Sequence, residues 1–201
     1  MNSDYYILEE GEQKGPYTFD EMIEMEPDIH TRVLSPEAEG WQDACDLPEF
    51  YEYFLSQGVN FPTEDNLASF WWRLLAYGID YVLLTVFFKG VLLLIGMTGR
   101  TIDLTSDKKL LMAEMYAFGI IILYHSICEA SAMKGSIGKA ACKLIVVDPD
   151  GMGLSFSNAL LRNVGKILSF MVFGIGFLSI FWNEYRQAWH DQLAKTYVIK
   201  R

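Results

Sequence analysis

The chain has 201 residues, of which 51% are apolar and 14% aromatic, and its formal net charge is −10 at pH 7. These averages combine two unlike parts. Residues 1–66 contain 17 Asp or Glu against Lys14 and Arg32, a net charge of −15, whereas residues 67–201 contain 9 acidic and 14 basic residues, a net charge of +5. The strong negative charge of residues 1–66 repels nucleic acid and anionic lipid, so nucleic acid is excluded as a partner. We expect a soluble domain at 1–52, a linker and interfacial segment at 53–69, and a membrane domain at 70–201.

The front domain is predicted to be a small α+β module. The segment Tyr5 to Leu8 is β-prone, and Thr31 to Leu34 predicts a second short strand. Thr18 and Glu21 have the spacing of a capping box, which predicts a helix beginning there. Trp41 is expected to anchor the small core. The polar, acidic start of the chain lacks a basic region followed by an apolar run, so we expect no secretory signal and a cytoplasmic front domain.

The first predicted span, Leu74 to Gly96, is long enough to cross a bilayer and contains Asp80. A charged carboxylate at the centre of a span costs roughly 2.5–3.5 kcal/mol on insertion scales, so Asp80 needs a protein or aqueous environment. Arg73 lies two helical turns before it, on the face that also carries Tyr77. An acidic residue in such a position indicates a functional site.

The second predicted span runs from about Met112 to Ala132 and is followed by a β-prone stretch. Within it, His125 and Glu129 lie one turn apart on one face. The stretch from Lys143 to Asp148 has a natural partner in Thr196 to Lys200, and the two can pair only on the same side of the membrane.

That pairing determines how the segment 159–189 is predicted to cross. Gly174 and Gly176 divide it into two arms of about fifteen residues, which favours a helical hairpin, although Val164 to Trp182 could also cross as one short third span. The hairpin leaves ten basic residues on the inside and three on the outside, as the positive-inside rule requires.

Several front-domain residues resemble the bacterial branch of the GYF domains over residues 4–50. The residues that carry the resemblance are Tyr5, Tyr6, Gly11, Gly15, Pro16, Tyr17, Met22, Thr31, Arg32, Val33, Gly40 and Trp41. Eukaryotic GYF domains bind proline-rich peptides on an aromatic surface. The resemblance thus makes Tyr6, Tyr17 and Trp41 candidate peptide-binding residues, and the alternative is that they only pack the core.

The rest of the chain resembles the RDD family of membrane proteins over about residues 66–200. The residues that carry this resemblance are Arg73, Asp80, Glu129, Ala130, Ser131, Gly138, Lys139, Val146, Val147, Asp148, Gly151, Leu161, Arg162, His190, Asp191, Thr196, Tyr197 and Val198. The arginine and two aspartates that name the family fall on Arg73, Asp80 and Asp191. Membership implies an integral membrane protein suspected of transport.

Two functions are open at this stage. In the first, Asp80 exchanges a proton or small cation, with the other charged candidates around it: Arg73, Asp191, Glu129, His125 and His190. The same residues could instead form a structural charge cluster. In the second, the chain is a membrane adaptor that recruits a protein or peptide through its front domain.

The remaining expectations concern chemistry and context. Gly135 to Lys139 suggests a phosphate loop, but that motif needs glycine where Met133 stands and serine or threonine where Ala140 stands. No nucleophile elbow or metal-binding helix is present either, so we expect no enzyme, no metal and no cofactor. Thin bundles of two or three spans favour a homo-oligomer. We expect a multi-pass protein of the bacterial cytoplasmic membrane.

Overall fold

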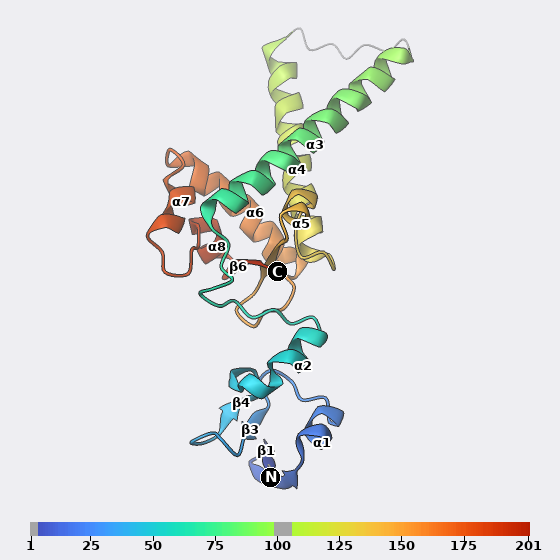
Figure 1. Cartoon of the computed structure of the whole chain (residues 1–201). Coiled ribbons are helices and arrows are strands. Elements are labelled where there is room, and N and C mark those ends of the chain that lie inside the picture. Colours follow the sequence, from blue (N-terminus) through green and yellow to red (C-terminus); the bar gives the residue numbers. More distant parts are fainter. Residues whose placement is uncertain (1–3, 99–105) are drawn as a thin grey trace. The chain divides into compact units, whose positions relative to one another are not determined.

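A computed structural model describes residues 4–98 and 106–201 (Figure 1). The chain divides into two compact units, Met1–Asn60 and Phe61–Arg201. Each unit has its own core, and each is described by itself.

The front unit is a four-stranded antiparallel sheet with short helices. Its order is β2-β1-β3-β4. The elements are β1 (Tyr5–Glu9), β2 (Glu12–Tyr17), α1 (Phe19–Glu24), β3 (Arg32–Leu34), β4 (Gln42–Asp43), the 3₁₀ turns η1 (Ala44–Asp46) and η2 (Pro48–Phe50), and α2 (Tyr51–Ser56). The predicted capping box is confirmed, because Thr18 accepts from the Glu21 backbone N–H and the Glu21 side chain accepts from that of Thr18.

The core of the front unit differs from the prediction. Trp41 is only half-buried. The central side chain is Phe50 from η2, which is fully buried and contacts the rings of Tyr5 and Phe19 at centroid distances of 6.0 and 5.2 Å. Trp41 precedes the two-residue strand β4 at the edge of the sheet, where fewer neighbours can cover a large ring.

The second unit contains two helices that are long and apolar enough to cross a membrane: α3 (Phe70–Met97) and α4 (Asp107–Ala130). The other elements are α5 (Ile137–Ala141), β5 (Leu144–Val147), α6 (Phe156–Met171), α7 (Ile175–Leu178), η3 (Ser179–Phe181), α8 (Trp189–Leu193) and β6 (Tyr197–Lys200). At ~1.5 Å per residue, the 28 residues of α3 extend about 42 Å, more than a hydrocarbon core of about 30 Å.

The predicted hairpin is a sharp bend between α6 and the pair α7–η3. The two parts meet at 112°, and Gly174 at the break has φ +77°, a left-handed conformation that glycine adopts without strain. The helical part of the second arm is shorter than predicted, because it ends at Phe181. The bent pair counts as a third span only if both parts are taken together.

The predicted strand pairing is confirmed and organises the unit. β5 and β6 are antiparallel, with Leu144 opposite Lys200 and Val147 opposite Tyr197. The chain just before α3 joins the same sheet, since the Ala68 N–H donates to the carbonyl of Val198 at 2.9 Å. The loop after α4, the beginning of α3 and the final strand therefore lie together.

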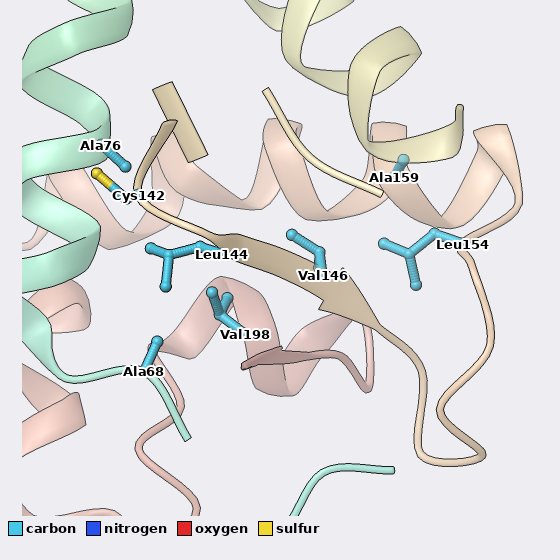
Figure 2. Close-up of a cluster of buried hydrophobic side chains, with 8 residues drawn as sticks. All are labelled: Ala68, Ala76, Cys142, Leu144, Val146, Leu154, Ala159 and Val198. Atoms are coloured by element: carbon cyan, nitrogen blue, oxygen red, sulfur yellow. The ribbon is translucent and has the colours of Figure 1, made fainter. Parts of the chain in front are cut away.

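A small apolar core fixes this arrangement (Figure 2). Buried side chains from α3, β5, β6 and α6 meet in it: Ala68, Ala76, Cys142, Leu144, Val146, Leu154, Ala159 and Val198. Because most of these side chains are small, the backbones approach closely, which brings the polar residues of α3, α4, α5, α6 and α8 within reach of one another.

Candidate functional site

Asp191, near the N-terminus of α8, is held by two arginines from distant elements. Its Oδ2 accepts from Arg73 Nη1 at 2.5 Å, and its Oδ1 accepts from Arg162 Nε and Nη2 at 3.0 and 2.6 Å. Arg73 also donates to the carbonyl of Arg186 at 2.6 Å. Although burial opposes ionisation of the Asp191 carboxyl, Arg162 and Arg73 outweigh it and hold its pKa well below the usual range.

Glu129, at the end of α4, is the second carboxylate of the same network. It accepts from Arg162 Nη1 at 2.7 Å, from Asn163 Nδ2 at 2.9 Å and from Lys139 Nζ. Its side chain is fully buried, as is that of Asp191, and Arg162 contacts both. The guanidinium of Arg162 thus joins α4, α6 and α8 through charge-assisted hydrogen bonds.

Asp80 occupies a different site, built from α3, α4 and α5. It is 2% exposed. Its Oδ1 accepts from Tyr124 Oη at 3.0 Å and from the Gly138 N–H at 2.8 Å, and its Oδ2 accepts from Ser136 Oγ at 2.5 Å. All three donors are neutral. Within the part of the chain that the structure describes, Asp80 makes no ion pair, and Arg73, predicted to share its site, contacts Asp191 instead.

Gly138 allows α5 to approach α3 closely enough to make this site. A Cβ at that position would lie 2.1 Å from the carbonyl oxygen of Ala76 and 2.8 Å from the Asp80 carboxyl carbon. Ser136 begins α5 as its N-cap, accepting from the Lys139 N–H at 3.4 Å, while its hydroxyl donates to Asp80. The segment Gly135 to Lys139, which does not match a phosphate loop, therefore binds the carboxylate of Asp80.

The two candidate histidines lie beside these sites in different ways. His125 is buried and stacks on Tyr77 with ring centroids 6.4 Å apart, and no hydrogen-bond partner for its Nδ1 is found among residues 4–98 and 106–201. It shares a helix face with Glu129, as predicted, but Glu129 bonds to other residues.

His190 belongs to the network around Asp191. Its Nδ1 lies 3.1 Å from Ser169 Oγ, and its Nε2 lies 3.3 Å from Asp191 Oδ1. Burial, with nearby arginines and Lys166, lowers the pKa of His190 to about 3 despite Asp191, so the ring is neutral near pH 7. Serine, histidine and aspartate meet here, but Ser169 is fully buried and Asp191 is already bonded to two arginines.

Six site residues were not among the candidates predicted from the sequence. They are Tyr124, Ser136, Gly138, Lys139, Arg162 and Asn163. The helical spacing of polar residues in α6 is a signal that could have identified two of them, because Arg162, Asn163, Lys166 and Ser169 form one polar face on an otherwise apolar helix.

The Asp80 site offers oxygen atoms, which suit a proton or a hard cation. Among the described residues, no three His, Cys, Asp or Glu side chains come together as a metal site would need. The chemistry that the arrangement supports is therefore exchange at a single carboxylate surrounded by hydroxyl groups.

The aromatic candidates of the front unit lie near its surface. Tyr6, Tyr17 and Trp41 are each half-buried, and the described structure contains no ring contact between any two of them. A shallow groove of about 670 Å³ lies elsewhere on this unit, between α1 and the η2–α2 segment. Its lining combines aromatic and acidic side chains, including Phe19, Tyr53, Asp20, Glu24, Glu49 and Glu52.

Comparison with known proteins identifies both units. Residues 67–195 match the family model described as RDD family, and residues 5–50 match the model described as GYF domain 2. The chain is 31% identical over 146 residues to the uncharacterized protein YxaI of Bacillus subtilis (strain 168), an alignment covering 66% of this chain and 96% of that protein. No solved structure matches the chain.

Proposed function

The chain belongs to the RDD family of membrane proteins, and we propose that it moves a proton or small cation across the membrane by exchange at Asp80. The observation that carries this proposal is the contrast in partners: Asp80 is buried among neutral donors, whereas Asp191 and Glu129 are each tied to permanent cations. An acidic residue buried inside a span without a balancing charge is costly, and such a residue therefore points to a functional site.

The donors around Asp80 can serve more than one charge state. Tyr124 and Ser136 present hydroxyl groups, which donate to an ionised carboxylate and can rotate to accept from a protonated one. Their oxygens, with those of Asp80, can also face a bound cation. A change in the protonation state of Asp80 therefore requires only hydroxyl rotation.

The ion-pair network is assigned a supporting role in this proposal. Arg162, Asp191 and Glu129 join α4, α6 and α8, and Arg73 joins the network to α3. Such a network holds α4 beside α3, so that Tyr124 meets Asp80. The arginine and second aspartate of the family pattern thus position the site and do not exchange ions.

Orientation follows from the distribution of basic residues. We place the β5–β6 sheet and the front unit in the cytoplasm of a bacterial cell, with the α3–α4 connection outside. This leaves Arg100, Lys108 and Lys109 outside and ten basic residues inside, in agreement with the positive-inside rule. The bacterial relative supports the assignment to a bacterial cytoplasmic membrane.

The test is ion flux in liposomes containing the full chain. We expect Asp80→Asn, which keeps the size of the side chain but cannot ionise, to abolish cation-dependent pH changes seen with the wild type. Asp107→Asn makes the same chemical change at an exposed carboxylate at the start of α4 and is expected to retain flux. If Asp80→Asn and the wild type are both folded and inserted and show equal flux, the proposal of exchange at Asp80 is wrong.

A second function, recruitment of a peptide by the GYF-like unit, is favoured by the exposure of its aromatic residues. Trp41, expected in the core, is only half-buried, as are Tyr6 and Tyr17. We expect the full chain in nanodiscs to bind a proline-rich peptide and Trp41→Ala to weaken that binding, measured by fluorescence polarisation. If no such peptide binds the wild type, peptide recruitment of this kind is refuted.

A further inference from the structure

Lys89 and Glu114 are charged residues inside the two helices that are long enough to span a membrane. Both are exposed, and in the described residues neither forms an ion pair. Apolar residues flank both, with Phe88 and Val91 near Lys89 and Ala113 and Met115 beside Glu114. Each therefore places a charge within a helix that is long enough to span a membrane, where a charged side chain is costly unless it reaches the interface or finds a partner.

The two charges lie at similar distances along their helices from one shared contact. The hydrogen bond from Tyr124 to Asp80 gives a common reference point on the two helices. From that bond toward the α3–α4 connection, Lys89 lies about 13.5 Å along α3 and Glu114 about 15 Å along α4, at roughly 1.5 Å per residue. The opposite charges could meet across an interface in which both helices keep the same orientation in the membrane.

Lys89 belongs to a continuous exposed face of α3. Helical spacing places Leu75, Gly78, Val82, Val86 and Leu93 on this face, and all five are exposed. The first half of this face is an open apolar surface of α3 that includes Leu75, Gly78 and Val82. Gly78 would let the backbone of another helix approach closely there.

We propose that a second copy of this chain covers this face. In the pair, Lys89 of each copy meets Glu114 of the other, about a two-fold axis along the membrane normal. The two-fold symmetry forms both charge pairs at once and keeps both copies in the same orientation in the membrane. This proposal does not depend on ion transport by Asp80.

The first test is cross-linking in liposomes between two chains with different tags, one carrying Lys89→Cys and the other Glu114→Cys. The native Cys45, Cys128 and Cys142 are replaced by alanine. We expect a disulfide-linked pair carrying both tags. The control is Phe87→Cys in place of Lys89→Cys, since Phe87 is also exposed but lies on the opposite face of α3. Equal cross-linking from the control would overturn the proposed interface.

A chain carrying both Lys89→Cys and Glu114→Cys separates the proposal from pairing within one copy. We expect its cross-linked product to run as a dimer. A product that runs as a monomer with an internal disulfide would show that the two helices pair within one chain, which contradicts the proposal.

Charge exchange is the second test. Lys89→Glu alone and Glu114→Lys alone each place like charges across the interface, and we expect each to weaken dimerisation about tenfold, measured by energy transfer between labelled chains. Mixing the two single variants restores opposite charges at both contacts and is expected to restore dimerisation, which also shows that each variant folds. Unchanged dimerisation of the single variants, or no rescue on mixing, would overturn the proposal.

Discussion

Among the residues that the structure describes, the membrane unit buries three carboxylates, and the partners of Asp80 differ from those of Asp191 and Glu129. Asp191 and Glu129 share Arg162 and are further tied to Arg73 and Lys139. Asp80 is held by two hydroxyl groups and one backbone N–H. Burial alone therefore does not separate a carboxylate that cations fix in the ionised form from one suited to the exchange proposed for Asp80. The charge of the partner does, because a permanent cation fixes the ionised form and a hydroxyl group does not.

The largest expected effect is a loss of stability on substitution of Arg162, which tests whether the ion pairs of Asp191 and Glu129 support the fold. Arg162→Leu leaves two buried carboxylates short of a cation, so we expect it to destabilise the protein by about 3–5 kcal/mol, the usual result of removing one partner from a buried ion pair. Unfolding in detergent followed by circular dichroism measures the change. Arg201→Leu, at an exposed position, is the control and is expected to unfold like the wild type. A wild-type unfolding curve for Arg162→Leu would show that the network does not support the fold.

A smaller effect is expected where α5 approaches α3 to cradle Asp80. Gly138→Ala places a methyl group against the Ala76 carbonyl and the Asp80 carboxyl, and we expect a loss of about 1–3 kcal/mol together with reduced flux. Gly153→Ala is the matched control, because its Cβ would contact only the flexible Lys134 side chain, at 3.5 Å or more. If Gly138→Ala matched this control in both stability and flux, the close approach of α5 would not matter for the site.

The smallest expected effect is a pH dependence of stability that arises from His190. Its pKa of about 3 lies below the ordinary value of 6.5, so the unfolded chain binds a proton that the folded chain does not. The stability is therefore fully present above pH 6.5 and is lost as the pH falls toward 3, by about 1 kcal/mol between pH 6.5 and 5.5.

Melting temperatures of the wild type and His190→Gln over this interval measure that contribution. We expect the variant to show a flatter pH dependence than the wild type. Parallel slopes for wild type and His190→Gln would mean that His190 is not held neutral by the network.

Much of the fold could be predicted from local patterns. The two long spans follow from hydropathy and length, and the antiparallel pairing of β5 with β6 follows from two β-prone stretches that have no other partner. The capping box at Thr18 is a local motif and was also predicted. Strands β2 and β4 were missed, because β2 contains Gly15 and Pro16 and β4 has only two residues, so neither has a strand pattern.

The candidate site was predictable only in part. Asp80 and Asp191 are conspicuous in the sequence, but the prediction that Arg73 serves Asp80 used their spacing along one helix. In the structure Arg73 reaches Asp191, which is 118 residues away, and Asp80 is met by Tyr124 and Ser136. Spacing on a helix shows which residues share a face and says nothing about which other helix supplies their partners.

The amino-acid sequence by itself determined that this protein has an acidic front unit and a membrane unit with buried charges, because composition and hydropathy are sums over neighbouring residues. Only the tertiary structure decided which charges meet. A hydrogen bond depends on distances of about 3 Å between atoms from different elements. Those distances follow from the packing of α3, α5 and α6 around one small core, where Gly138 admits the Asp80 cradle and Arg162 joins the two remaining carboxylates.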